Sequence, residues 1–520
     1  MEELKPMFAR VWGGDARGSW SATLDREVKL AFPARGVMLA ANLCEPMNQP
    51  PLQRSPSDQA PADKTNAPSA TAAARRAVFT EGPIMRHVAV MTATGSVGLV
   101  AVFIVDLLSL LYISWLGDPH LTAGVGYATQ IMFFMISIGI GLSIAVSALM
   151  ARDIGAGNRE RARRYCASGL THIFIISIAL TLVALPLRRE LVGLLGASGK
   201  SLEVASNFLA ITLPANALMS LGMALSGSLR AVGDARRSMY VTLWGGAITA
   251  ALDPLLIFGL NMGVDGAAVA TAISRLVFTA VGLWGAVHVH NLIARPNWAH
   301  VRQDLRPMAV VALPAIATNL AAPVATSWVL RVFSQYGEPV IAAFAIIDRL
   351  APVAFGIMFA LSGAVGPIVA QNWGARRYDR IRRTLTDCFT LAISYALLMW
   401  GLLWLSAPLI IDTFAATGQT AAIVDFFCKI GAVQWLFLGC LFVANAVFNN
   451  LGFAFLSTAF NWGRATVGTI PFVVLGTQWG GPEGGLLGLV MGAALFGSAA
   501  IYTAYAMVRR LAKADAEAVT

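Results

Sequence analysis

Residues 151–164 read ARDIGAGNRERARR, and residues 370–383 read AQNWGARRYDRIRR. The stretches lie 219 positions apart and share two alanines, one glycine and three arginines: Ala151, Gly155, Ala156, Arg161, Arg163 and Arg164 recur as Ala370, Gly374, Ala375, Arg380, Arg382 and Arg383. At the same offset, Gly233, Ser238 and Gly266 recur as Gly452, Ser457 and Gly485. Several matches at one offset indicate an internal duplication.

The composition is that of a membrane protein. Hydrophobic residues make up 57% of the 520 residues and charged residues 13%, whereas an ordinary soluble domain carries about 25% charged residues. A soluble chain of this size cannot hide so much apolar surface, because its outside must be wetted. The composition therefore excludes a soluble multidomain enzyme, a disordered scaffold and a disulfide-stapled secreted domain.

Long apolar runs follow one another from about residue 84 to residue 508, separated by short loops. A membrane span needs about 20 apolar residues. The sequence predicts an all-α polytopic protein with twelve transmembrane helices, at about 85–115, 121–150, 165–187, 203–229, 238–261, 265–289, 307–335, 339–370, 385–411, 423–448, 455–478 and 484–508.

The charges of the loops predict the orientation. Arginines gather after the even-numbered spans, as in 151–164 and 370–383, whereas the odd-numbered loops offer only Arg188, Arg189 and Lys200. Lys and Arg accumulate in cytoplasmic loops, so we expect both termini in the cytoplasm and a location in the cell inner (plasma) membrane. The net charge of +10 has the same origin, and we expect no nucleic-acid partner.

Twelve spans and one duplication predict two six-helix bundles. Because six is even, the halves share one membrane orientation and are related by a pseudo-two-fold axis along the membrane normal, with a substrate cavity between them. We place the bundles at residues 81–300 and 301–520. Residues 1–80, with six prolines between Pro46 and Pro68, are predicted to be a disordered cytoplasmic extension.

Two carboxylates interrupt the apolar spans of the first half. Asp106 lies in GLVAVFIVDLLSLLYI and Asp253 in GGAITAALDPLLIFG, each without a basic residue in its own span. Ionisable residues inside spans mark functional sites, and burial disfavours the charged form, so such an acid can bind and release a proton near neutral pH. Pro254 removes a helix hydrogen bond beside Asp253, and Thr249 lies one turn before it. Thr271 brings a hydroxyl into the sixth span, although either threonine can instead bond its own helix.

Three stretches together carry a family resemblance: the arginine-rich loops, SLRAVGDARRSMY (228–240) and ALDPLLIFGLNMGVDGAAVAT (251–271). Over about residues 80–510 the chain resembles the multidrug and toxic compound extrusion (MATE) transporters, above all the DNA-damage-inducible (DinF-like) branch. The resemblance implies two six-helix bundles around a V-shaped cavity. It also implies export of amphipathic, cationic compounds in exchange for protons or sodium ions.

The resemblance assigns the coupling site to the first half. Asp106 and Asp253 match the branch's first-span and fifth-span acids, and Thr271 matches its sixth-span threonine. The family's asparagine before the fifth-span acid is replaced here by Thr249, which offers one oxygen and no amide. A sodium-coupled branch has an acid after a Leu-Pro turn, where this chain has Ala321 and Ala322. We therefore expect proton coupling, with sodium as the alternative.

The second half carries other charges inside or near its spans. Asp348 is a reserve candidate for contact with substrate or ion. Asp425 and Lys429 are spaced to pair with each other on one helix. His288, His290 and His300 are expected to be solvated loop residues. The five cysteines form no CxxC pair and the histidines no HExxH cluster, so we expect neither a metal site nor a cofactor.

These observations predict a multidrug efflux antiporter that exports xenobiotics or toxic metabolites by alternating access and works as a monomer. Methionines and phenylalanines of spans two and four are candidates for the cavity wall: Met132, Phe133, Phe134, Met135, Met219 and Met223. A lipid-linked oligosaccharide flippase is the first alternative, but its anionic cargo wants basic residues, and the first half has only Arg275 well inside a span. A polytopic membrane enzyme is less favoured, because no nucleophile, base or metal cluster is apparent.

Overall fold

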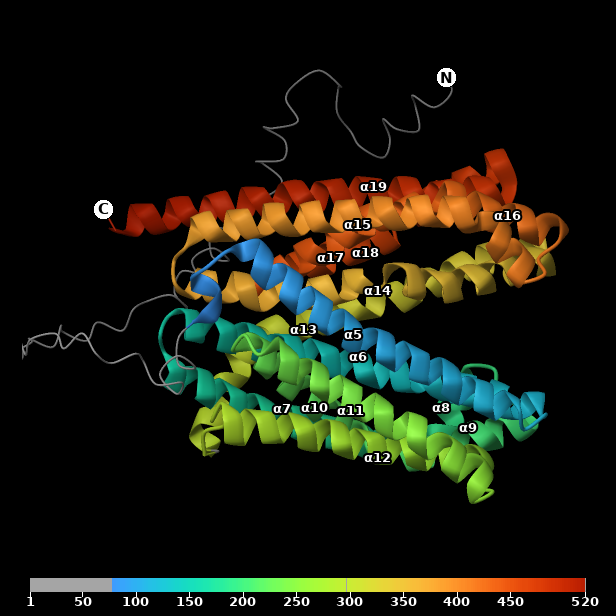
Figure 1. Cartoon of the computed structure of the whole chain (residues 1–520), viewed down its shortest axis with the longest axis horizontal. Helices are drawn as coiled ribbons and strands as arrows, with labels where there is room; N and C mark the ends of the chain where they lie inside the picture. Colours follow the sequence, from blue (N-terminus) through green and yellow to red (C-terminus); the bar gives the residue numbers. More distant parts are fainter. Residues whose placement is uncertain (1–76, 296, 520) are drawn as a thin grey trace, which may run out of the picture. The chain divides into compact units, whose positions relative to one another are not determined.

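The computed structural model describes residues 77–295 and 297–519, and these residues form helices joined by short loops (Figure 1). The extension predicted for residues 1–80 lies outside the described residues except for its last four. Of those four, Val78–Thr80 form a 3-10 turn, η1, whose Phe79 is buried. The last residues of the predicted extension are therefore structured, and the prediction for residues 1–76 lies outside the described part of the chain.

The first half contains seven α-helices together with one short helix. They are α5 (Ile84–Ser114), α6 (Pro119–Gly155), α7 (Arg159–Ala184), the short α8 (Arg188–Leu194), α9 (Gly199–Thr212), α10 (Asn216–Ala231), α11 (Ala235–Pro254) and α12 (Gly263–Trp284). Two π-helical turns, η2 (Leu255–Gly259) and η3 (Gly285–Val289), extend α11 and α12.

The second half repeats this order. It comprises α13 (Trp298–Phe333), η4 (Ser334–Tyr336), α14 (Glu338–Gly374), α15 (Tyr378–Thr413), α16 (Gly418–Lys429), η5 (Gly431–Val433), α17 (Gln434–Asn450), α18 (Ala454–Ala465) and α19 (Ile470–Val519). In the first half α9 and α10 together make the fourth span, whereas in the second half η5 and α17 are long enough by themselves and α16 precedes them.

Short loops begin several helices in the same way. Gly157 and Gly233 adopt positive φ angles of 78° and 90°, which glycine tolerates without strain. The next residue, Asn158 or Asp234, accepts a hydrogen bond at 3.0 Å from the backbone N–H three residues on. Such N-caps satisfy donors that a helix start leaves free. The sequence pattern Gly-Asn or Gly-Asp thereby fixes where α7 and α11 begin.

The span count agrees with the prediction once two bends are recognised. Ten helices are long and apolar enough to cross a membrane, and α9 with α10, bent by 55°, makes an eleventh span. The last of the ten, Ala454–Glu517, covers the final two predicted spans, because the helix is broken at Gly480 and Gly481. Gly476 packs against the backbone of Gly484, and Gly492 against that of Gly468, so the chain turns back on itself there.

The two halves pack with the internal symmetry that the duplication predicts. The first helix of each half lies between its own fifth span and the second helix of the other half: α5 contacts α11 and α14, and α13 contacts α18 and α6. Ser143 Oγ donates to the carbonyl of Met223 at 3.0 Å, and Ser362 Oγ donates to that of Phe442 at 3.1 Å. Both residues of the second bond stand 219 positions after those of the first, which confirms the two-bundle repeat.

The halves meet most closely at the end that carries the 151–164 and 370–383 stretches, called here the arginine-rich end. A Cβ atom on Gly155 would lie 1.9 Å from the carbonyl oxygen of Gln371, and one on Gly374 would lie 1.9 Å from that of Arg152. The Gln371 amide accepts from the Phe79 N–H at 3.0 Å and donates to the Ala231 carbonyl at 2.7 Å. Both glycines are therefore required for the close crossing of α6 and α14.

Candidate functional site

Asp253 is the most deeply buried acid of the first half's spans. It lies at the end of α11 with 1% of its surface exposed. Its Oδ2 accepts a hydrogen bond from Ser109 Oγ of α5, whereas its Oδ1 has no hydrogen-bond partner among the described residues. A buried carboxylate with an unsatisfied oxygen is costly, and this arrangement leaves a place for a proton or a cation.

Asp106 lies one helical turn before Ser109 on α5, so both side chains point to the same side of that helix. Its side chain is exposed. Asp106 lies within electrostatic range of Asp253 and of the Arg275 guanidinium. The structure therefore gathers the two predicted acids around Ser109, one accessible and one enclosed.

Neither acid is neutralised by an ion pair within the described part of the chain. Arg275 of α12, although buried, donates its Nη1 to the Thr212 carbonyl at 2.8 Å. That carbonyl is free because α9 and α10 bend there. Arg275, which lies well inside its span, thus supports a helix bend and leaves Asp106 without a direct salt bridge.

Pro254 follows Asp253 as the last residue of α11, and the helix continues as the π-helical turn η2. Proline has no N–H to donate to the carbonyl four residues back, and π-turns often accompany functional sites. A Cβ atom built on Gly266 of α12 would lie 2.8 Å from the backbone of Leu256 in this turn. The irregular backbone beside the acid is therefore held by a close contact with the next helix.

Thr249 and Thr271 do not donate to the acids. Thr249 Oγ1 donates to the Gly245 carbonyl at 3.2 Å and Thr271 Oγ1 to the Ala267 carbonyl at 2.9 Å, each within its own helix. Ser109 provides the hydroxyl that reaches Asp253, and the sequence analysis did not select it. Its position three residues after Asp106, on the same helix face, was the available signal.

The acids predicted in the second half differ in whether they form an ion pair. Asp348 of α14 is exposed, and the ion pairs of the described residues do not include it. Lys429 Nζ lies 2.8 Å from Asp425 Oδ2 on α16, which confirms the predicted pair. Asp348 is therefore an acid of this half that remains available inside a span.

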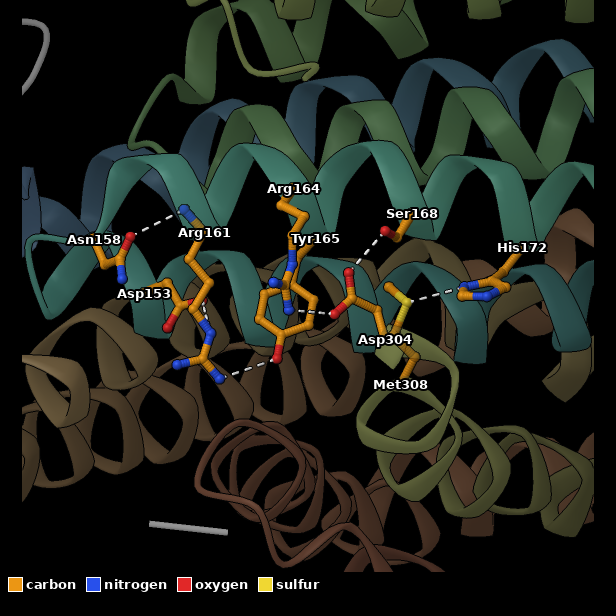
Figure 2. A network of polar contacts seen from close by, with 9 residues as sticks. All are labelled: Asp153, Asn158, Arg161, Arg164, Tyr165, Ser168, His172, Asp304 and Met308. Atoms are coloured by element: carbon orange, nitrogen blue, oxygen red, sulfur yellow. Dashed lines mark hydrogen bonds and ion pairs between the residues drawn. The ribbon is translucent and has the colours of Figure 1, made fainter. Parts of the chain in front are cut away.

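A second polar network, at the arginine-rich end, joins α7 to the start of α13 (Figure 2). Asp304, with no exposed surface, accepts from Arg164 Nη2 at 2.6 Å and from Ser168 Oγ at 2.8 Å. One turn further along each helix, His172 Nδ1 lies 3.3 Å from Met308 Sδ. The network attaches the first helix of the second half to the first half. It was not predicted, because Asp304 lies between two of the predicted spans.

Two of the three histidines predicted to be solvated loop residues at this end differ from that prediction. His300 lies inside α13 and is half-buried. His290 is partly buried, and its Nε2 lies 2.7 Å from Asp234 Oδ2, whereas His288 is exposed as expected. Burial alone would raise the pKa of Asp234, but hydrogen bonds from His290 and Arg237 outweigh it and lower that pKa to about 2. Asp234 therefore ties the α10–α11 loop to the end of η3.

Comparisons with known proteins relate both halves of the chain to one family. The MatE family model matches residues 96–255 and 314–475, one segment in each half. The FAD transporter of Shewanella oneidensis is 26% identical over 81% of this chain and 94% of its own length. The multidrug export protein MepA of Staphylococcus aureus is 25% identical over 57% of this chain and 66% of its own length. The crystal structure of the MATE transporter VcmN from Vibrio cholerae matches with a TM-score of 0.78 and 23% identity, over 82% of this chain and 97% of that one.

Proposed function

The chain belongs to the MATE family of transporters, whose model matches both of its halves, and from this premise we propose a proton-coupled exporter of amphipathic cations. Protons entering along their gradient would drive the compound out by alternating access. We also assign it, on the strength of Asp106 and Asp253, to the DinF-like branch. The protein would act as a monomer in the cell inner membrane.

One observation carries the coupling proposal: Asp253 is buried, and one of its oxygens has no partner among the described residues. Protonation supplies the missing hydrogen on that carboxyl group and removes its buried charge. Asp106, exposed and on the same side of α5 as Ser109, would exchange protons with the solvent and pass them to Asp253. Each charge that crosses the membrane gains about 2.3 kcal/mol per 100 mV, which can drive export against a gradient.

Protons suit this site better than sodium ions. A sodium ion needs several oxygen ligands, whereas one hydroxyl, that of Ser109, is bonded to Asp253, and Thr249 and Thr271 bond to carbonyls of their own helices. Thr249 also stands where the sodium-compatible arrangement of the family would offer an amide oxygen. A carboxyl group with a single hydroxyl partner, by contrast, is sufficient to hold a proton. We keep sodium exchange as the alternative that the test below distinguishes.

Export of a flavin dinucleotide is the second candidate function. It is favoured by the likeness to the Shewanella FAD transporter, which extends over 94% of that relative. The two candidates differ in the charge of the cargo, because FAD carries a negative pyrophosphate. Asp106, Asp253 and Asp348 all favour a positively charged cargo.

The orientation is also part of the proposal. Arginines cluster at one end of the helices, where α6 meets α7 and α14 meets α15, and cytoplasmic loops are enriched in such residues. The arginine-rich end would therefore face the cytoplasm together with both termini. A cysteine placed at each end, labelled in intact cells with a membrane-impermeant maleimide, tests this orientation.

The decisive experiment reconstitutes the protein into vesicles and measures ethidium transport driven by a pH gradient. Asp253→Asn and Asp106→Asn should each abolish gradient-driven transport, because an amide cannot carry the proton. Asp425→Asn is the matched control, since that acid pairs with Lys429 on α16 and should be dispensable. Wild-type transport in both test variants would refute the proposal. Transport driven by a sodium gradient alone would replace protons by sodium, and transport of FAD without ethidium would favour the second candidate.

A further inference from the structure

Four aromatic side chains stack against one another where α14 meets α17. Phe355 and Trp435 have ring centroids 4.9 Å apart with nearly parallel planes, and Phe359 and Phe442 have centroids 5.1 Å apart. Edge contacts of 6.3 Å and 6.5 Å join Trp435 to Phe359 and to Phe442. We call these four residues the aromatic cluster. The partners of the two stacked pairs lie 80 and 83 positions apart in sequence, so no local sequence pattern indicates the cluster.

The fold itself does not require these rings. At the equivalent positions of the first half, 219 residues earlier, the chain has Ile136, Ile140, Asn216 and Met223. The surrounding frame is the same in both halves, since Ser143 bonds the Met223 carbonyl as Ser362 bonds that of Phe442. The first half thus makes this helix contact with aliphatic and amide side chains. The aromatic cluster is a departure from the symmetry, as are Asp106 and Asp253 in the first half.

Phe359 leaves part of its ring uncovered, although it lies on a central helix. It is 40% exposed, while α14 buries a larger share of its apolar length than the other spans of the described chain. A Cβ atom built on Gly363, one turn further on, meets no atom within 4 Å. Open space therefore adjoins Phe359 on the side towards Gly363.

The helix geometry shows where this space lies. On one side of Phe359 and Gly363 along the circumference of α14, Phe355 and Ser362 contact α17. On the other side, Gly356 and Ala360 face Phe103 and Gly95 of α5, which belongs to the first half. At 100° per residue, Phe359 and Gly363 point between these two directions. The free face of the Phe359 ring is therefore turned towards the space between the halves.

Asp348 continues the same exposed strip of α14. It precedes Phe359 by eleven residues, about three turns, which places both on one face of the helix roughly 16 Å apart along its axis. Asp348 is exposed, and no ion pair of the described residues includes it. On the other side of the aromatic cluster, the buried Nε1 of Trp435 has no hydrogen-bond partner in the part of the chain described. The strip thus combines an aromatic face, a free donor and an available negative charge.

We propose that the aromatic cluster binds a planar aromatic group of the transported compound, by stacking on Phe359, while Asp348 attracts a positive charge on the same compound. This site rests on the proposed transport function. It assigns proton coupling to the first half of the chain and recognition of the transported compound to the second half. Aromatic faces attract both π-systems and cations, so planar aromatic cations are the class that this site suits best. A flavin shares the planar ring but lacks the positive charge.

Ligand binding to the purified full-length protein tests the site without any gradient. Ethidium, a planar aromatic cation, reports binding through its fluorescence. Phe359→Leu keeps an apolar side chain but removes the ring, and we expect it to weaken ethidium binding about tenfold, the order expected for loss of a stacking contact. Phe359→Tyr keeps the ring and should bind as the wild type does. Ile140→Ala, at the equivalent position of the first half, is the matched control and should leave binding unchanged.

Two further arms separate charge from stacking. Asp348→Asn should weaken ethidium binding less than Phe359→Leu does, because the charge of ethidium lies in the ring that stacks on Phe359, roughly 16 Å from Asp348 along the helix. It should leave binding of riboflavin, a neutral planar probe, unchanged. Tetraethylammonium, a cation without rings, should be transported equally by wild type and Phe359→Leu. Unchanged ethidium binding in Phe359→Leu, or an equal loss in Ile140→Ala, would overturn the site even if gradient-driven export continues. Ethidium binding that depends on Phe359 without any gradient-driven export would overturn the transport proposal instead.

Discussion

Gly155 and Gly374 occupy equivalent places in the two halves, and each lies against the backbone of the other half's helix. An ideal Cβ on either one would come 1.9 Å from a carbonyl oxygen, that of Gln371 or that of Arg152. Gln371 and Arg152 are themselves equivalent, 219 positions apart. The crossing of α6 and α14 is therefore a symmetric contact that only glycine permits.

The first prediction concerns this crossing. Gly155→Ala or Gly374→Ala forces the two backbones apart, and we expect each variant to lose about 1–3 kcal/mol of stability, the range for overpacked contacts. Four of the cysteines, Cys166, Cys388, Cys428 and Cys440, are buried and free, so a thiol-reactive dye reports thermal unfolding. Gly401→Ala, on α15 with no atom within 4 Å of its Cβ, should not lower the melting temperature. Equal melting temperatures for Gly155→Ala and wild type would contradict the symmetric contact.

The second prediction concerns Ser109. Ser109→Ala removes the hydroxyl that donates to Asp253 and leaves that carboxylate without a hydrogen-bond partner among the described residues. We expect pH-driven export in vesicles to fall by about tenfold or more, within the range attributed to a positioned proton-transfer group. Ser109→Thr, which restores a hydroxyl, should recover most of the activity. Ser114→Ala is the control on the same helix, because Ser114 bonds only its own helix at Leu111.

The third prediction concerns the buried network around Asp304 (Figure 2). Arg164→Ala leaves a buried carboxylate with Ser168 alone, and we expect a loss of about 3–5 kcal/mol, as for other broken buried ion pairs. Asp304→Asn keeps a hydrogen-bonding side chain of the same size and should lose less. Because the two residues share one contact, the double variant should lose less than the sum of the single losses. Additive losses in thermal unfolding would show that the ion pair does not hold α13 to α7.

The fourth prediction is a pH dependence at Asp234. Hydrogen bonds from His290 and Arg237 outweigh burial and lower the pKa of Asp234 from 3.8 to about 2 in the folded protein. A carboxylate whose pKa is lowered by folding stabilises the protein above its unfolded pKa, and this contribution is lost as the pH falls through the folded value. We expect Asp234→Asn to lower stability at pH 6 on the order of 1 kcal/mol, after allowance for solvent screening. The difference from wild type should shrink between about pH 4 and pH 2, and a constant difference would exclude this linkage.

Much of the architecture was predictable because it rests on local patterns. The repeat at 151–164 and 370–383, the apolar spans and the Gly-Asn and Gly-Asp loop signals each depend on neighbouring residues or on direct comparison of the halves. Asp106 and Asp253 were recognisable because charges are rare in apolar spans. Their proximity followed from the family resemblance, and the structure places both acids around Ser109.

The contacts that were not predicted from the sequence join residues far apart in the chain. Ser109 and Asp253 are separated by 144 positions and Arg164 and Asp304 by 140, and neither pair leaves a local pattern. Thr249 was a reasonable choice for a partner of Asp253 because it lies one turn away, but its hydroxyl donates to Gly245. The aromatic cluster was missed for the same reason, since its two helices begin almost a hundred residues apart.

The side chain of Gln371 has a consequence for the way the arginine-rich end comes apart. Its single amide group holds the backbone of Phe79 on one side and that of Ala231 on the other. A rotation of this one side chain would break both bonds together, while Asn372 and Arg380 would still hold the Phe79 carbonyl. Gln371 thereby couples its two backbone contacts, so that the one to Phe79 and the one to Ala231 form and break at the same time.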